Sequence, residues 1–227
     1  MQLAGKVVVV TGAFGQLGRA VVQEVLAQGG RAALLDVVAG QAPEGGAAWK
    51  VDLTSLADAS RVLAEVAGQF GRIDALANIA GGFRWQTLEA SDDLAEWTAL
   101  QAMNLQTCVT ACKAVLPHLK SAGAGRIVNV GATGALKGSS GMGAYAASKG
   151  GVMRFTEALA DELKLQEITV NAVLPSIIDT PANRADMPKA NYDRWVKPQE
   201  IARVIAFLLS DAASAVTGAL VPVTGKS

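Results

Sequence analysis

Residues 6–18 read "KVVVVTGAFGQLG", and this stretch decides the fold. Its β-branched run ends at Thr-Gly, which predicts a short buried strand. Three glycines follow at equal spacing (Gly12, Gly15 and Gly18), and residues 16–30 continue with helical periodicity. A turn without side chains between a strand and a helix lets a phosphate reach the backbone and the positive end of the helix dipole. The stretch therefore predicts the first unit of a nucleotide-binding sheet.

The alternation of strand and helix continues along the chain. Further strands are predicted at residues 31–37, 73–82, 125–132, 168–176 and 217–225, and further helices at 58–71, 94–123 (one or two helices), 145–166 and 197–211. Such alternation predicts βαβ units and one parallel sheet of roughly six or seven strands. No linker rich in proline, serine or charge divides the sequence, so we expect a single domain.

The composition limits the classes to which the protein can belong. Hydrophobic residues make up 51% of the 227 residues and charged residues 18%, so the chain can bury a large core and disorder is not expected. The formal net charge is zero, which argues against nucleic acid or a membrane surface as a partner. No run approaches the ~20 apolar residues of a membrane span, and the N-terminus lacks a signal-peptide pattern. We expect a cytoplasmic protein that acts on a small molecule.

The cysteines and the histidine do not form a metal-binding pattern. Cys108 and Cys112 lie four residues apart in an apolar, helix-like segment, and His118 is the only histidine in the chain. Two sulfurs without further ligands nearby do not make a zinc site. We therefore predict two buried thiols and no metal site.

Asp36 ends the second predicted strand, close to the ~20-residue offset from the glycine turn that a ribose-binding acid has. A carboxylate there accepts a hydrogen bond from the ribose 2′-hydroxyl and repels a 2′-phosphate. Val37 and Val38 follow, and neither offers a positive charge to a phosphate. The sequence therefore favours NAD(H) over NADP(H). The alternative is an ordinary surface aspartate at the end of a strand.

Tyr145 and Lys149, in "YAASK", lie four residues apart in a predicted helix and so share one of its faces. A lysine ammonium near a phenol favours the phenolate, so we expect Lys149 to lower the pKa of Tyr145 toward neutrality. By itself this spacing is common in ordinary helices. Here it follows a dinucleotide-binding pattern, which favours proton transfer to or from a substrate as the role of the pair.

Together, "TGAFGQLG", "NIAGG" and "YAASK" resemble the short-chain dehydrogenase/reductase family, and the resemblance covers essentially the whole chain. It implies an α/β fold over residues 1–227: a single Rossmann-type, doubly wound parallel sheet of about seven strands flanked by helices. It also implies that Tyr145 and Lys149 are catalytic, that Asn104 joins a proton relay, and that the protein is a homodimer or homotetramer.

The same resemblance assigns residues to the cofactor. Asp52 would contact the adenine, Asn78 would support the sheet beside the cofactor, and Thr180 would lie near the carboxamide end. The full set of expected cofactor-binding residues is Gly12, Phe14, Gly15, Gln16, Leu17, Gly18, Asp36, Asp52, Leu53, Asn78, Ala80, Gly81, Tyr145, Lys149, Pro175 and Thr180.

The chain departs from the family pattern at two positions. Gln16 stands where glycine is commoner, and Ala132 stands where the usual catalytic serine would be. Hydride addition to an isolated ketone places charge on one oxygen, and loss of one of its two donors typically costs about 3 kcal/mol. Thr133, Ser139 and Ser140 are neighbouring hydroxyls that could replace the serine, but strand alternation points Thr133 elsewhere.

A substrate that spreads the charge through a conjugated ring needs the second donor less. Dihydropteridine reductases fit this description, and "GATGALKGSSGMGAYAASKG", "VLPSIIDTPANRADMP", "AGGFRW" and "LLDVV" resemble their segments. This likeness implies NADH-dependent reduction of quinonoid dihydropterin with Tyr145 as proton donor. The candidate substrate-binding residues are Phe83, Trp85, Thr133, Asn183, Met187 and Trp195.

Residues 177–197 ("IIDTPANRADMPKANYDRWVK") form the one long irregular stretch. A loop of this length inside a compact domain is usually functional and is often a lid. We therefore predict a substrate loop here. Residues 224–227 ("TGKS") resemble the end of a phosphate loop, but no helix follows them, so we interpret them as a tail.

Two other functions stay open. The first is a carbonyl or alcohol oxidoreductase of the broader family (3-oxoacyl- or keto-reductase-like), with Thr133 or water in place of the serine. The second is a catalytically degenerate nucleotide-binding sensor. Retention of Tyr145, Lys149 and Asn104 argues against the sensor, since a sensor does not need a proton relay.

Overall fold

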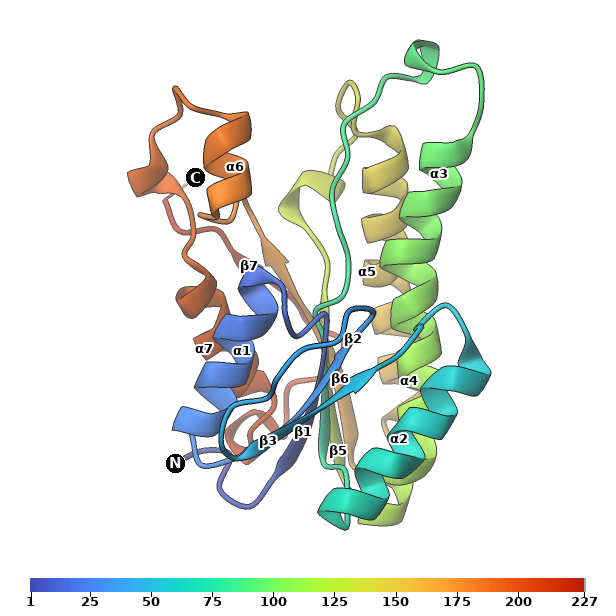
Figure 1. Ribbon diagram of the computed structural model, residues 1–227, viewed down its shortest axis with the longest axis vertical. Coiled ribbons are helices and arrows are strands. Elements are labelled where there is room, and N and C mark those ends of the chain that lie inside the picture. The colour runs from blue at the N-terminus through green and yellow to red at the C-terminus, as the bar shows by residue number, and fades with distance from the viewer. Residues whose placement is uncertain (227) are drawn as a thin grey trace.

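The computed structural model describes residues 1–226, which build one seven-stranded parallel sheet in the order β3-β2-β1-β4-β5-β6-β7 (Figure 1). The strands are β1 (Val7–Thr11), β2 (Arg31–Asp36), β3 (Gly46–Lys50), β4 (Ala75–Asn78), β5 (Gly125–Val130), β6 (Ile168–Pro175) and β7 (Leu220–Val223). The strand order reverses at β1, between β2 and β4, and open α/β sheets bind ligands at the carboxyl ends of the strands beside such a reversal. The expected fold class is confirmed.

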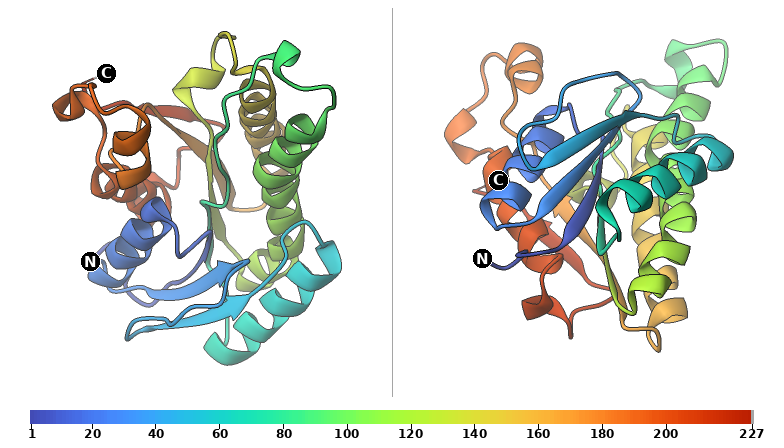
Figure 2. Two further views of the ribbon diagram at one scale, coloured as in Figure 1. Left: turned by 45° about the horizontal axis from the view of Figure 1, so that its top comes forward. Right: turned by 60° about the horizontal axis from the view of Figure 1, so that its bottom comes forward.

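Helices cover both faces of the sheet (Figure 1; Figure 2). They are α1 (Gln16–Ala27), α2 (Leu56–Phe70), α3 (Ala95–Leu100), α4 (Thr107–Ala122), α5 (Gly143–Leu163), α6 (Pro181–Asp186) and α7 (Pro198–Leu208). Val8 and Val10 pack with α1 and α7, whereas Val9 packs with α2 and α4. Both faces of β1 are therefore buried, which explains its continuous valine run. None of the helices within residues 1–226 combines the length and apolar character that a membrane crossing needs.

Three segments differ from the prediction. The sequence did not predict β3, because "GAAWK" has no β-branched residue, and this strand lies at the sheet edge, paired only with β2. The helical stretch 94–123 divides into α3, a π-helical turn (Gln101–Gln106) and α4. The supposedly irregular stretch 177–197 contains α6 and a 3-10 turn (Tyr192–Arg194).

Candidate active site

At Gly12 and Gly18, the glycine turn between β1 and α1 has no room for a side chain. Gly12 has a φ of +59°, and a Cβ there would lie 2.8 Å from the Cα of Ala80. A Cβ on Gly18 would overlap the carbonyl oxygen of Gly12. Gly15 is the N-cap of α1, so the backbone N–H groups of the first turn of α1 point out of the turn. Because glycine occupies these positions, no side chain covers the N-terminus of α1, and an anion can reach it.

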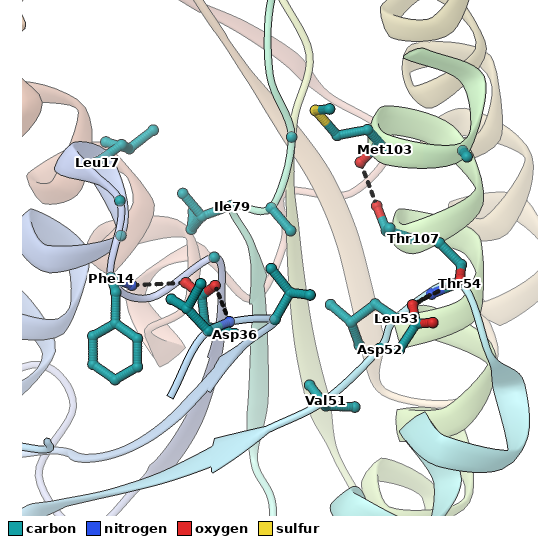
Figure 3. Close-up of a pocket in the computed structure, with 18 of the residues that line it drawn as sticks. Phe14, Leu17, Asp36, Val51, Asp52, Leu53, Thr54, Ile79, Met103 and Thr107 are labelled. Carbon is teal, nitrogen blue, oxygen red and sulfur yellow. Dashed lines mark hydrogen bonds between the residues drawn. The ribbon is translucent and has the colours of Figure 1, made fainter. Parts of the chain in front are cut away.

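Asp36 closes the same turn from the end of β2 (Figure 3). Its Oδ2 accepts a hydrogen bond from the backbone N–H of Phe14 (3.0 Å), and its Oδ1 accepts one from Val38 (3.3 Å). A carboxylate has about four lone-pair sites, so these two bonds leave acceptor capacity for a ribose hydroxyl. The carboxylate thus stabilises the turn and stays available at the edge of the cleft.

A cleft of about 670 Å³ runs along the carboxyl ends of β1, β2 and β4. Its lining gathers most of the residues expected to bind the cofactor, and Figure 3 shows Phe14 and Asp36 on one side and Asp52 and Leu53 on the other. The expected residues that line it are Gly12, Phe14, Gly15, Gln16, Leu17, Gly18, Asp36, Asp52, Leu53, Ala80 and Gly81. Asp52 is held by hydrogen bonds that its Oδ1 accepts from the N–H and the hydroxyl of Thr54 (2.8 and 2.7 Å).

The residues present fit a dinucleotide. The turn gives a phosphate access to unobstructed backbone, Asp36 offers a carboxylate to a ribose, and apolar Val37, Val38 and Leu53 line the remaining wall for a flat base. Gln16, which replaces the commoner glycine, begins α1 with an exposed side chain, so it occupies the rim of the cleft without blocking it.

Asn78 lies behind the cleft and does not line it. This buried side chain donates to the Oδ1 of Asn129 (3.0 Å), and the Nδ2 of Asn129 donates to the hydroxyl of Thr156 (2.9 Å). Asn78 therefore joins β4, β5 and α5. The Thr11 hydroxyl accepts from the N–H groups of Ile79 (3.0 Å) and Ala80 (3.1 Å), which fixes the chain as it leaves β4.

Asn104 lies in the π-helical turn, a feature frequent at functional sites. Its Oδ1 accepts from the N–H of Gly82 (2.8 Å), and its Nδ2 donates to the carbonyl of Gly82 (3.1 Å) and to the hydroxyl of Ser148 (2.9 Å). Ser148 in turn donates to the carbonyl of Tyr145 (2.8 Å). Asn104 thereby connects the turn after β4 to the first turns of α5.

Gly81 joins the cleft to the catalytic pair. It lines the cleft, and a Cβ on it would lie 2.7 Å from the Oδ1 of Asn104 and 3.1 Å from the Nζ of Lys149. Tyr145 stands one helical turn before Lys149 on α5, and its ring packs edge-on against Phe83 with centroids 4.9 Å apart. The structure thus places Lys149 and Asn104 beside Gly81 of the cleft, with Tyr145 one helical turn from Lys149.

The expected lowering of the Tyr145 pKa is wrong for this structure. Burial raises the pKa of Tyr145 to about 12. Burial also lowers the pKa of Lys149 to about 8, and the Lys149 ammonium donates to the carbonyl of Val130 (2.8 Å). Attraction between the ammonium and the phenolate would lower the pKa of Tyr145, but the removal of both groups from water outweighs it here.

Ala132 is buried two residues after Val130, whose carbonyl accepts from Lys149, and it offers no hydroxyl. The neighbouring Thr133 donates its hydroxyl hydrogen to the carbonyl of Pro175 (3.1 Å), as strand alternation suggested. Its hydroxyl is therefore not directed as a second donor to a substrate oxygen. This bond also joins the segment after β5 to the end of β6.

Comparison with known proteins gives this geometry a family. The short chain dehydrogenase model matches residues 6–191. The chain belongs to the short-chain dehydrogenase/reductase family. The 3-oxoacyl-(acyl-carrier-protein) reductase FabG of Pseudomonas aeruginosa is 35% identical over 246 residues, covering 99% of this chain and 98% of that protein. The reductase of the same name from Thermotoga maritima is 34% identical with the same coverage.

A solved structure agrees with these relatives. The 3-ketoacyl-(acyl-carrier-protein) reductase from Brucella melitensis, complexed with NADH, matches with a TM-score of 0.87 and 29% identity over 98% of each chain. The protein is thus an NAD(P)-dependent oxidoreductase of the short-chain type. The relatives favour the keto-reductase interpretation over the dihydropteridine one.

The candidate substrate residues of this family member divide into two groups. Phe83 and Trp85 are about half exposed beside Tyr145 and the 139–142 turn, and the Trp85 indole donates to the carbonyl of Ser140 (3.1 Å). Asn183, Met187 and Trp195 belong to the 177–197 loop, beyond β6.

Within that loop, several of the expected contact residues have structural partners. Thr180 is the N-cap of α6 and accepts from the N–H of Asn183 (3.2 Å), while the Asn183 amide donates to the carbonyl of Ile178 (2.7 Å). Trp195 is buried against Tyr192, and its ring does not line the cleft. Pro175 ends β6 and is buried.

The sequence argument missed several residues of the site. Ser148, which connects Asn104 to Tyr145, lay inside the quoted "YAASK" and gave no signal of its own. Thr11 was quoted only as the end of a strand. The cleft is also lined by Val51, Thr54, Ile79, Ala99, Ala102, Met103 and Thr107, which come from segments that carry no motif.

Proposed function

We propose that this protein uses NADH to reduce a carbonyl group of a small molecule, with Tyr145 as the proton donor. One observation carries the proposal: Lys149 and Asn104 meet at Gly81 of the dinucleotide cleft, and Tyr145 lies one helical turn before Lys149 on α5. The similarity to 3-oxoacyl reductases supports a 3-oxoacyl thioester as the substrate class.

The residues of the chain suit the reductive direction. Bound NADH supplies the hydride. With a pKa of about 12, the Tyr145 phenol stays protonated at neutral pH and can donate to the substrate oxygen. The phenolate that forms lies one helical turn from Lys149. With a pKa of about 8, the Lys149 side chain is mostly an ammonium at neutral pH and stabilises the phenolate. Asn104 holds both the Gly82 turn and the start of α5, so it fixes the distance between cofactor and proton donor.

The preference for NADH rests on Asp36. Its carboxylate stands at the edge of the cleft between the N–H groups of Phe14 and Val38, where a ribose 2′-hydroxyl would be a donor and a 2′-phosphate would be repelled. Val37 and Val38, which line the same edge, bring no positive charge.

Ala132 favours a second candidate, an acceptor in a conjugated heterocycle such as quinonoid dihydropterin. With the Thr133 hydroxyl committed to Pro175, Tyr145 is the principal donor left for an oxyanion. A conjugated ring spreads the incoming charge and depends less on a second donor. The two candidates share the cofactor, the tyrosine and the lysine, and differ in the acceptor.

Initial rates of NADH oxidation with acetoacetyl-CoA and with quinonoid dihydropterin, each beside an NADPH series, separate the candidates. Fast turnover of acetoacetyl-CoA supports the first candidate and fast turnover of the pterin supports the second. Installing the hydroxyl as Ala132→Ser sharpens the result, since a second donor should accelerate ketone reduction by on the order of 10²-fold. NADH binding without turnover of either acceptor would contradict both candidates.

We also propose a cytoplasmic homodimer or homotetramer. An apolar groove on the outer side of α3 and α4 is lined by Leu94, Trp97, Leu105 and Val109, and Leu94 is 63% exposed. Exposed apolar patches of this kind commonly mark contacts between subunits. Light scattering should give two or four times the chain mass of 23.3 kDa, and a monomer mass would contradict the proposal.

A further inference from the structure

We propose that residues Thr224–Lys226, here called the C-terminal anchor, position the substrate loop (residues 177–197) over the catalytic pair. The inference rests on the proposed function, because it takes this loop to contact the substrate. It gives a role to Thr224, Gly225 and Lys226, which do not line the dinucleotide cleft; Ser227 lies outside the described residues.

The substrate loop is closed at its base by its own backbone. Ile178 and Val196 form a parallel β-bridge. The N–H of Val196 donates to the carbonyl of Ile177 (3.2 Å), and the N–H of Asp179 donates to the carbonyl of Val196 (2.8 Å). The two ends of the loop therefore leave and re-enter the body of the protein at one place.

Above this base the loop is a compact unit. The Arg184 guanidinium makes two hydrogen bonds to the carboxylate of Asp179 (2.6 and 2.9 Å) and lies 4.6 Å from the centre of the Tyr192 ring. That ring packs against buried Trp195, with centroids 4.8 Å apart. The bidentate ion pair and the ring contacts restrain the loop internally. The position of the loop relative to the sheet therefore depends on the contacts at the base of the loop.

The C-terminal anchor holds the base from the other side. The N–H of Lys226 donates to the carbonyl of Arg194 (3.1 Å), and the Nε of Arg194 donates back to the carbonyl of Lys226 (3.3 Å). The Ser176 hydroxyl donates to the carbonyl of Thr224 (2.8 Å). The anchor thus contacts both the chain entering the loop and the chain leaving it, and Figure 1 shows the red C-terminal segment running beside the orange loop.

The loop base also adjoins the catalytic end of the sheet. Pro175, two residues before the loop, pairs with Val223 in the β6–β7 ladder, and its carbonyl accepts the hydrogen bond of Thr133, next to Ala132. A shift of the anchor relative to the sheet would therefore move the loop with respect to Tyr145. A displacement of about 1 Å can cost up to 10²-fold in a reaction that depends on orientation.

Gly225 offers the sharpest test. Its φ is +64°, and a Cβ would lie 3.2 Å from the carbonyl oxygen of Arg194 and from the Cα of Val196. Gly218, before β7, is the matched control: its φ is +71°, but the nearest atom to a Cβ there is the Cβ of Ala160 at 3.6 Å. Gly225→Ala and Gly218→Ala thus carry similar backbone strain, and only the first pushes on the loop base.

We would measure backbone hydrogen exchange, NADH affinity by fluorescence, and KM and kcat for the better acceptor. Gly225→Ala should accelerate exchange of the loop amides about tenfold and raise KM about tenfold, while NADH affinity stays within twofold of the parent. Gly218→Ala should leave loop exchange and KM unchanged. If Gly225→Ala does not fold, Arg194→Met removes the side-chain bond alone and should give the same changes at smaller size.

The inference is overturned if the loop amides of Gly225→Ala exchange no faster than those of Gly218→Ala. Where Gly225→Ala does not fold, the same comparison is made with Arg194→Met. Exchange needs no substrate, so this outcome is independent of the proposed reaction. If the parent protein reduces neither acceptor, the proposed function is overturned. Faster loop exchange in Gly225→Ala would then still support the contact between the C-terminal anchor and the substrate loop. Faster exchange with an unchanged KM would overturn the positioning role.

Discussion

The cofactor half and the substrate half of this molecule are built differently. In the cofactor half, Gly12, Gly18 and Ala80 approach one another so closely that backbone crowding defines the turn. In the substrate half, contacts join residues that are distant in the sequence: Phe83 with Tyr145, Thr133 with Pro175, and Arg194 with Lys226. One half depends on backbone shape and the other on which distant segments pack together.

This difference explains why the cofactor is easier to assign than the substrate. A steric requirement for glycine leaves a trace in any sequence that adopts the turn. The hydrogen bond from the N–H of Lys226 to the carbonyl of Arg194 leaves none, since it joins backbone groups that nearly every residue carries. Each of the following changes affects one half and is measured against the other.

The largest effect is expected for Tyr145→Phe. The variant keeps the ring that packs against Phe83 and loses only the hydroxyl, so the fold should be unchanged. We expect kcat to fall by about 10²–10⁴-fold, the usual contribution of general acid catalysis, and NADH affinity to stay within about twofold. Steady-state kinetics and NADH fluorescence titration measure the two quantities.

The matched control is Tyr192→Phe in the substrate loop, whose hydroxyl donates weakly to the carbonyls of Arg184 and Met187 (3.3 Å each). It should change kcat by less than about threefold, because removal of such bonds typically costs 0.5–1.5 kcal/mol of stability, not of catalysis. Turnover by Tyr145→Phe near the parent rate would contradict the role of Tyr145 as the proton donor.

Sequence reasoning succeeded where one residue type is required by local geometry. The turn needs Gly12 at positive φ, and the end of β2 places Asp36 against that turn, so the sequence located both residues correctly. It failed where a property such as a pKa depends on contacts between residues that are distant in the sequence. The pKa of Tyr145 rises because neighbours from other segments exclude water, and no spacing in the sequence reports that exclusion.

The second effect tests the crowding of the cofactor turn. In Gly18→Ala the new Cβ would overlap the Gly12 carbonyl, and such overpacking costs about 1–3 kcal/mol. We expect NADH affinity to fall by up to about 10²-fold. Gly68→Ala is the control, since Gly68 is also helical and has no atom within 4 Å of a Cβ; it should gain up to about 1 kcal/mol of stability.

Isothermal titration and thermal unfolding of the two glycine variants make the comparison. Equal NADH affinities in Gly18→Ala and Gly68→Ala would contradict the view that backbone crowding shapes the cofactor half. Loss in Gly18→Ala, together with unchanged exchange in the substrate loop, would show that the two halves respond separately.

The third effect concerns the cost of burying Lys149. Its pKa falls from 10.5 to about 8 in the folded protein, so the unfolded chain binds more protons on this residue between these values. The destabilisation is fully present below about pH 8 and disappears as pH rises toward 10.5. Lys149→Met should therefore raise the free energy of unfolding by about 2 kcal/mol at pH 7, after loss of the bond to Val130.

Chemical denaturation at pH 7 and above pH 10 checks the sign. The gain of Lys149→Met should shrink at the higher pH, while reduction of the acceptor is lost at both. Reduction by the parent protein should decline as pH rises through about 8, where Lys149 loses its charge. A variant less stable than the parent at pH 7 would show that Lys149 stabilises the fold.

The smallest effect separates the two acids of the cofactor cleft. Asp36→Asn keeps an oxygen for the N–H of Phe14 and removes the charge, so NADH should bind about tenfold more weakly and NADPH more tightly. Asp52→Asn, at the adenine side of the cleft, should weaken both cofactors equally, because their adenines are identical. Fluorescence titration with each cofactor gives the NADH to NADPH affinity ratio. If that ratio does not change in Asp36→Asn, the carboxylate holds only the turn, and the NADH preference must come from the shape of the Val37–Val38 edge.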